Sequence, residues 1–169
     1  MEQPTNLNLF QAHKYQMTIA RVPNFTYYCQ TIDIPGLTMA ELPVPGPGID
    51  NYIPNSKPVF EPLLCTFQID EDLRSWTELY NWMWSKTFGE NQTIIPGHPF
   101  NRGEQPGSFY STVIITFYNT RNTPTFRFNF ENAFPVLLGG IRLHTNESNV
   151  PLVTSDVTFR YTKYTFQKI

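Results

Sequence analysis

The stretch that decides the fold is residues 67–88, FQIDEDLRSWTELYNWMWSKTF, whose pattern predicts the one helix of this chain. Asp70 can accept a hydrogen bond from a first-turn N–H, and Glu71 and Asp72 add negative charge at the positive end of the helix dipole. Apolar side chains then recur at steps of three and four residues, at Leu73, Trp76, Tyr80 and Met83. We therefore predict a helix from about Glu71 to Lys86 that packs on a sheet through those four side chains.

The segments on either side of the helix read as β-strands. Strand-like patterns, most of them with the alternating period of two, cover residues 14–20, 27–34, 60–69, 108–119, 125–131 and 152–166. About five residues separate 108–119 from 125–131, which favours a hairpin. Residues 132–143 fit either a short apolar crossing or a turn. A chain of 169 residues indicates one domain, residues 1–169.

One loop carries apolar side chains that a solvent loop does not need. Residues 42–58, LPVPGPGIDNYIPNSKP, contain five prolines and two glycines, which argues against a central strand. The same segment also carries the apolar side chains of Val44, Ile49, Tyr52 and Ile53. It is either a loop folded over its own sheet or an extended arm that contacts a neighbouring subunit. We also expect an N-terminal arm over 1–12, ordered only on docking, and a surface insertion over 89–107.

Composition and charge narrow the range of possible functions. The chain has 12 basic and 14 acidic residues, so its net charge of −2 shows no electrostatic footprint for nucleic acid. Aromatic residues are as frequent as charged ones, at 15% each, which suggests that other subunits cover part of the apolar surface. No secretory signal or membrane span is visible. We expect Cys29 and Cys65 to be free, buried thiols, with a disulfide between them as the alternative.

The sequence offers no pattern typical of an active site. The histidines, His13, His98 and His144, lie far apart, and no paired-thiol, nucleophile-elbow, phosphate-loop or dinucleotide motif is present. The acidic cluster at 70–72 is explained by helix capping, although a carboxylate or calcium site with Asp33 is conceivable. Tryptophans 76, 82 and 84 could stack on a sugar, but burial accounts for them more simply. We expect no enzyme activity, no cofactor and no metal.

The order of these features resembles the tail tube family of contractile-tailed bacteriophages, together with the baseplate and tube-initiator proteins that share its fold. The resemblance spans roughly residues 15 to 166. It rests on Asn24-Phe25, on Ile34-Pro35-Gly36-Leu37, on Phe60, on the run from Phe67 to Leu73, on Trp76, Tyr80 and Asn81-Trp82-Met83, and on the closing run from Val157 to Thr162. No single motif is diagnostic, and it is the order that is moderately specific.

The resemblance implies a mainly β fold of two packed antiparallel sheets, a β-sandwich or barrel, with one flanking α-helix. It implies six copies in a ring, rings stacked into a tube through which DNA passes without specific binding, and no catalysis. Tail sheath, baseplate and tape-measure proteins are the implied partners. The implied location is the virion tail, after synthesis in the host cytoplasm. On this basis Arg127, Asn129 and Glu131 are candidates to face the lumen.

Two other functions stay open. The insertion over 89–107 is longer than the simplest tube proteins need between helix and strand, which favours a related ring at the baseplate, tube-initiation or neck end. The other alternative is a monomeric β-sandwich that binds a glycan or a receptor through its tryptophans. Oligomeric state discriminates between them, because the first requires a ring and the second a monomer.

Overall fold

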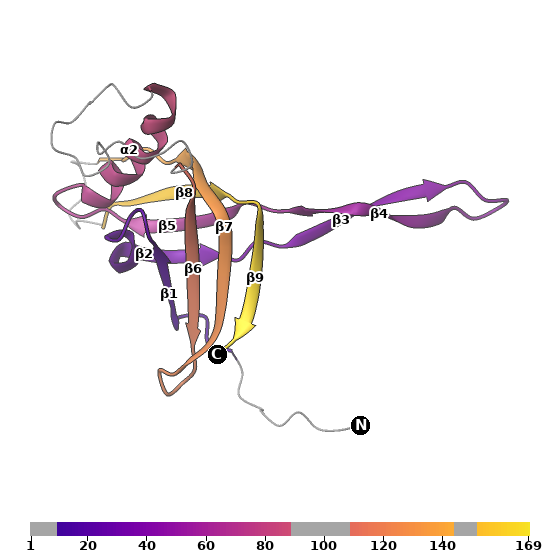
Figure 1. The fold of residues 1–169 in the computed structure, drawn as a ribbon, viewed down its shortest axis with the longest axis horizontal. Helices are drawn as coiled ribbons and strands as arrows, with labels where there is room; N and C mark the ends of the chain where they lie inside the picture. The colour runs from indigo at the N-terminus through magenta and orange to yellow at the C-terminus, as the bar shows by residue number, and fades with distance from the viewer. Residues whose placement is uncertain (1–9, 89–108, 144–151) are drawn as a thin grey trace.

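The computed structural model describes residues 10–88, 109–143 and 152–169 (Figure 1). In chain order the elements are β1 (Tyr15–Ile19), α1 (Phe25–Tyr28), β2 (Cys29–Asp33), β3 (Leu37–Val44), β4 (Asn51–Phe60), β5 (Leu63–Gln68), α2 (Arg74–Phe88), β6 (Ser111–Tyr118), β7 (Pro124–Leu138), β8 (Thr154–Arg160) and β9 (Lys163–Lys168). The expected N-terminal arm, apart from residues 10–12, and the whole expected insertion 89–107 lie outside the described residues.

Two layers of antiparallel strands form the body of the molecule. The main sheet has the order β1-β6-β7-β8-β5-β2, and β9 pairs with β7. The long strand β7 serves both layers: residues 126–131 pair with β9, and residues 134–138 pair with β8. Asn132 lies between these halves with a φ of 54°, so the strand turns there. In Figure 1 the layer β1-β6-β7-β9 runs across the direction of β2, β5 and β8.

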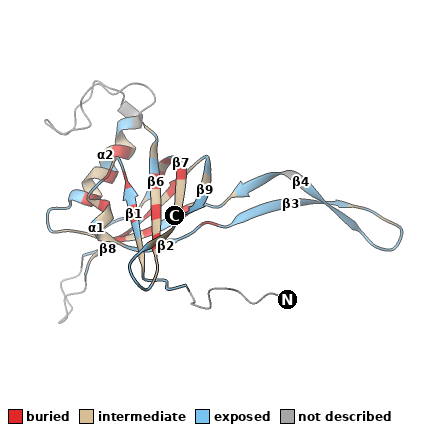
Figure 2. Cartoon of the chain, turned by 60° about the horizontal axis from the view of Figure 1, so that its bottom comes forward, coloured by how far each residue is buried: buried red, intermediate tan, exposed pale blue. Residues whose placement is uncertain are grey.

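The core lies between the two layers and beneath α2, as the buried positions in Figure 2 show. The Sγ atom of Cys65 on β5 lies 3.7 Å from the Sδ atom of Met17 on β1, so the layers are in direct contact. The largest fully buried side chains are Trp82, Phe25, Phe67, Phe130 and Phe159. The expected fold, mainly β with two antiparallel sheets and a flanking helix, is confirmed. Among the described strands the sheets do not close into a barrel.

The helix is present, but its buried face is not the predicted one. The side chains that α2 buries are Ser75, Leu79 and Trp82, at steps of four and three residues. Of the predicted stripe, Leu73 is 41% exposed and Tyr80 is 38% exposed, whereas Trp76 and Met83 are half-buried. Leu73 has a φ of 53° and precedes the first helical residue, so it is not part of the helical stripe. The helix packs instead through Trp82, whose ring lies 6.0 Å from that of Phe159 on β8.

Two expected strands have different bounds in the structure, and one ambiguous segment proves to be strand. The segment 27–34 starts with the short helix α1, and only its second part forms β2. The ambiguous residues 132–138 are strand, because β7 continues through them to pair with β8. The single strand expected over 152–166 is divided into β8 and β9, which belong to different layers.

The loop interpretation of residues 42–58 was wrong. Residues 37–60 form a long hairpin, β3–β4, whose strands pair over Leu37↔Phe60 to Val44↔Asn51. Prolines are accepted because both strands of a two-stranded ribbon are edge strands, so half of their N–H groups need no ladder partner. The hairpin extends away from the body (Figure 1).

Candidate assembly interfaces

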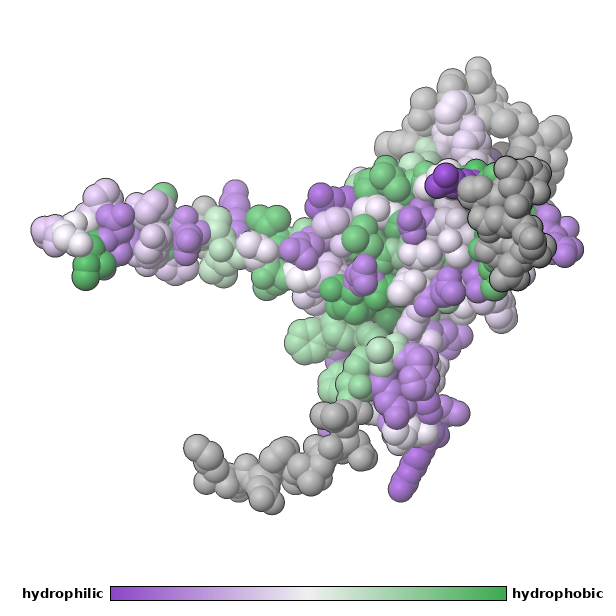
Figure 3. Space-filling view, turned by 180° about the vertical axis from the view of Figure 1, so that it is seen from behind, coloured by the Kyte–Doolittle hydropathy of each residue, from purple (hydrophilic) through white to green (hydrophobic). Residues whose placement is uncertain are grey.

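The β3–β4 hairpin, here called the arm, is the most exposed apolar feature of the described structure. Its two strands pair only with each other. Apolar patches alternate with polar ones along its length (Figure 3). Three of the four predicted contact residues are strongly exposed: Ile49 by 79%, Tyr52 by 63% and Ile53 by 52%. Val44 is half-buried. The arm therefore does not cover its own sheet, which was one of the two interpretations of this segment.

The register of the arm sorts its side chains onto two faces. Residues directly opposite in an antiparallel pair share a face, and successive residues alternate. Leu42 lies opposite Ile53, and Val44 opposite Asn51, which makes one face aliphatic. On the other face Pro43 lies opposite Tyr52 and Glu41 opposite Pro54. The predicted contact residues thus divide: Val44 and Ile53 share the aliphatic face, Tyr52 lies on the proline-rich face, and Ile49 belongs to the connecting turn.

The root of the arm is anchored on the corner between β8 and β9. The ring of Phe60 packs against those of Tyr161 and Tyr164, with centroids 5.9 and 5.3 Å apart. The Tyr161 hydroxyl donates a hydrogen bond to the Glu61 carbonyl oxygen at 2.8 Å. Desolvation by burial, with a smaller contribution from Tyr164, raises the pKa of Tyr161 to about 12. This hydroxyl therefore stays protonated, and the hydrogen bond persists, across the physiological pH range.

A polar face covers the outside of the layer formed by β6, β7 and β9. Arg127, Asn129 and Glu131 alternate along β7 and lie opposite Gln167, Thr165 and Lys163 of β9. The Lys163 Nζ atom lies 3.3 Å from the Glu131 Oε2 atom, so positive and negative charges are mixed here. On the other side of β7, Phe130 is buried, Phe128 is half-buried and Phe126 is 42% exposed. The expected division of β7 is present, although only Phe130 is fully enclosed.

A second polar face lies on the outside of β2, β5 and β8, and the sequence analysis did not single it out. Its side chains are Thr31, Asp33, Leu64, Thr66, Asp156 and Thr158. The Thr66 hydroxyl donates to the Asp156 Oδ1 atom at 2.7 Å. Its carboxylates are Asp33 and Asp156, and the alternation along β8 places Arg160 on the same face. Because the two layers pack together, their outer faces point in opposite directions. The alternation of apolar and polar residues along β5 and β8 was the sequence signal that could have identified this face.

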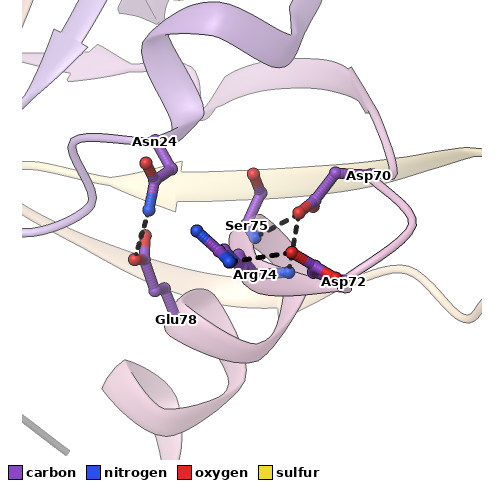
Figure 4. Close-up of polar contacts among 6 residues, drawn as sticks. All are labelled: Asn24, Asp70, Asp72, Arg74, Ser75 and Glu78. Carbon is purple, nitrogen blue, oxygen red and sulfur yellow. Dashed lines mark hydrogen bonds and ion pairs between the residues drawn. The ribbon is translucent and has the colours of Figure 1, made fainter.

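The acidic cluster near α2 is a helix cap. The Asp70 carboxylate accepts hydrogen bonds from the backbone N–H groups of Arg74 at 3.1 Å and Ser75 at 3.3 Å (Figure 4). Asp72 pairs with Arg74 at 2.8 Å, also on the surface. The capping prediction is confirmed.

Within the described part of the chain, no group of three potential metal ligands occurs, and no helix is long and apolar enough to span a membrane.

Three aromatic rings stack along the outer side of α2. Trp76, Tyr80 and Trp84 recur every four residues, and we call them the aromatic ladder. Trp76 and Tyr80 have ring centroids 5.4 Å apart with planes 14° apart, and for Tyr80 and Trp84 the values are 5.8 Å and 13°. The Trp76 Nε1 atom donates to the Gly139 carbonyl oxygen at 3.1 Å, which fixes that ring against the end of β7. Trp82 is instead fully buried, and its Nε1 atom donates to the Phe109 carbonyl oxygen.

The two thiols are free, as expected, but only Cys65 is buried, whereas Cys29 is half-buried. Both Sγ atoms contact the Met17 Sδ atom, Cys29 at 4.0 Å and Cys65 at 3.7 Å. Burial raises the pKa of Cys29 to about 12 and that of Cys65 well above its ordinary value. At neutral pH both are uncharged thiols, which makes them unreactive packing groups rather than nucleophiles.

These features define a class: a mainly β protein with layers of antiparallel strands, one flanking helix, a projecting arm and polar outer faces. The chain belongs to the phage tail tube protein family, whose model matches residues 4–167. It is also similar to the tail tube terminator protein of Enterobacteria phage T4, with 26% identity over 147 residues, 85% of this chain and 79% of that protein.

Solved structures show the same fold in contractile injection systems. The tube-terminating cap of the anti-feeding prophage has a TM-score of 0.63 at 12% identity, over 99% of this chain and 97% of that chain. A chain of the sheath–tube complex of an extracellular contractile injection system has a TM-score of 0.59 at 14% identity, over 96% and 94%. At these identities the comparison establishes the fold, and the tail tube fold expected from the sequence is confirmed.

Proposed function

We propose that this protein forms hexameric rings that stack in a phage tail tube, a conduit for genome delivery. The observation that carries the proposal is the arm: in a chain of the tail tube family, a hairpin with apolar side chains on both faces extends beyond the folded body. Exposed apolar surface of this extent is typical of a contact with another chain. The proposed role is structural, with no catalysis and no cofactor.

The channel face in this proposal is the polar face of β6, β7 and β9. Its mixed charges, Arg127, Glu131 and Lys163, give little net attraction for phosphate. A lumen that conducts DNA must not hold it, because each phosphate neutralised by a basic side chain adds affinity. DNA therefore passes along Arg127, Asn129 and Glu131 without specific binding. The polar face of β2, β5 and β8 then points outward.

The proposed partners are further copies of this chain, the tail sheath, the baseplate and the tape-measure protein, in the virion tail after synthesis in the host cytoplasm. Support comes from the neighbours in fold, among them a chain of a sheath–tube complex and a chain of a baseplate. The outer polar face of β2, β5 and β8 is a candidate to meet the sheath.

A terminating ring at one end of the tube is a second candidate. One observation favours it: the T4 relative is a tail tube terminator. A baseplate or tube-initiator ring has the support of a baseplate chain with a TM-score of 0.59. The monomeric glycan-binding alternative is less well supported, because Trp82 is fully buried and cannot stack on a sugar.

The mass of the purified protein in solution tests the ring. Light scattering after size exclusion is expected to give six times the 19.6 kDa of the chain, with larger species if rings stack. Mixing with purified sheath protein then separates the two ring candidates: a repeating tube subunit grows into long tubes, whereas a terminating ring stays short and blocks the end of preformed tubes. A stable monomer at high concentration would contradict both.

A further inference from the structure

We propose that the proline-rich face of the arm docks on the aromatic ladder of a neighbouring copy. The inference rests on the proposed assembly into rings, and it identifies the two surfaces through which neighbouring copies meet. The donor surface is Pro43, Tyr52 and Pro54, which the register of β3 and β4 places on one face, with Glu41 opposite Pro54 on the same face. The acceptor surface is the ladder Trp76, Tyr80 and Trp84 on α2.

The two surfaces have matching chemistry. Proline rings pack against aromatic side chains in the recognition of proline-rich peptides by aromatic-lined grooves. Because the ladder rings stack on one another, the prolines of the arm meet the exposed edge of Tyr80. Proline has almost no side-chain entropy to lose, and tyrosine and tryptophan lose little because they have few rotatable bonds. The ladder is already ordered, since its planes lie within 14° of one another and Trp76 is hydrogen-bonded to Gly139. Both surfaces are thus rigid before they meet.

The geometry requires the contact to be between copies. The helix α2, which carries the ladder, and the arm lie at opposite ends of the molecule (Figures 1 and 2), so the arm does not reach the ladder of its own chain. The eight residues of β3 span roughly 26 Å at about 3.3 Å per residue, which is enough to reach across a subunit boundary. A contact between two different surfaces is heterologous, and heterologous contacts generate rings when the rotation closes.

Tyr80 is the residue of the ladder best placed to meet a partner. It is the central ring, stacked on both sides, and it is 38% exposed. A charge at this position disrupts an apolar stack, whereas loss of the hydroxyl does not. We expect Tyr80→Glu to raise the concentration needed for half-assembly by roughly thirtyfold, the loss typical of an interface hot spot. The matched variant Tyr80→Phe is expected to assemble as the unmodified protein does, and circular dichroism checks that both fold.

A photoreactive side chain locates the contact directly. Benzoylphenylalanine in place of Tyr52 keeps an aromatic ring on the proline-rich face, and the same group in place of Ile53 samples the opposite face of the same strand. Rings are assembled from a mixture of isotopically light and heavy copies, irradiated, and digested for mass spectrometry. We expect position 52 to cross-link to residues 73–84 of a different copy and position 53 to cross-link elsewhere.

The outcomes separate this inference from the ring itself. Rings that form while position 52 labels another element, or while Tyr80→Glu assembles normally, overturn the docking and leave the ring intact. Equal labelling of 73–84 from positions 52 and 53 also overturns the assignment to the proline-rich face. A protein that stays monomeric without modification overturns both the docking and the proposed function.

Discussion

At the scale of residues, the helix shows which side chains hold the protein together. Leu73 adopts a φ of 53° before the helix begins, and the buried positions within α2 are Ser75, Leu79 and Trp82. Trp82 fills the space between α2 and β8, where its ring lies 6.0 Å from that of Phe159. The ladder residue Tyr80, four positions after Trp76, stays at the surface.

This assignment predicts different costs for two aromatic residues on one helix. Trp82→Ala removes a fully buried ring and is expected to lower the free energy of unfolding by about 3–5 kcal/mol. Tyr80→Ala removes a ring that is 38% exposed and is expected to cost markedly less. Urea denaturation measures both. Equal losses would show that α2 packs through its other side.

The cap of α2 makes a second prediction at this scale. Asp70 accepts hydrogen bonds from two first-turn N–H groups, so Asp70→Ala is expected to cost about 0.5–2 kcal/mol of stability. The matched control is Glu71→Ala, because Glu71 is the next residue and is exposed. Thermal melts of the two variants make the comparison. If Asp70→Ala has the same melting temperature as Glu71→Ala, the Asp70 carboxylate is not a helix cap.

The buried thiols give a prediction with a pH dependence. The thiolates are disfavoured in the folded state, which holds the pKa of Cys29 near 12 and that of Cys65 well above its ordinary value. An unfolded thiol loses its proton at about 8.5, so the stability these thiols contribute is full below that pH and falls as pH rises above it. At pH 8, iodoacetamide is expected to label both cysteines in urea and neither in the native protein. Rapid labelling of native protein would refute the burial.

At the scale of elements, the arm separates folding from assembly. Its strands pair with each other and not with the body, so its side chains contribute little to the core. Replacing Val44, Ile49, Tyr52 and Ile53 together by Ser is expected to leave the melting temperature of the monomer nearly unchanged and to abolish assembly. Analytical ultracentrifugation makes the comparison. Normal assembly by this variant would mean that other surfaces hold the copies together.

The elements also show what sequence patterns can and cannot predict. The alternation of Met17 with Thr18, and of Leu63 with Leu64, follows from burial on one face, and the strands there were predicted correctly. The arm was missed because proline normally marks a loop, and only a ribbon with two free edges accepts so many. The break between β8 and β9 was missed because Tyr161 continues the apolar phase, while the two strands pair with different partners. The arrangement of neighbouring copies determines which polar face lines a channel. Local sequence patterns therefore cannot predict that face.

At the scale of the whole molecule, two polar faces point in opposite directions and carry different charges. The face of β6, β7 and β9 mixes Arg127, Glu131 and Lys163. The face of β2, β5 and β8 carries the carboxylates Asp33 and Asp156, with Arg160 at the end of β8. In a ring the side chains of the inner face recur in every copy. A single charge substitution on the inner face is therefore repeated in every copy along the channel. A charge substitution on the outer face does not come near the DNA.

This difference gives a matched pair of variants. Unmodified rings are expected to bind DNA no tighter than the ordinary non-specific range of ~10⁻⁴–10⁻⁶ M. Glu131→Lys is expected to tighten binding and steepen its salt dependence, whereas Asp156→Lys leaves both unchanged. Fluorescence anisotropy over a salt series measures this. The reverse result would place the β2-β5-β8 face in the channel.

The central claim is that copies of this chain close into a ring around an open channel. Electron microscopy of the purified, unmodified protein tests it most directly. The account predicts six-fold rings with a central channel, lined by β6, β7 and β9 and bridged by the arm of each copy. Particles that stay monomeric at all concentrations, or rings whose centre is filled by the arms, would contradict it.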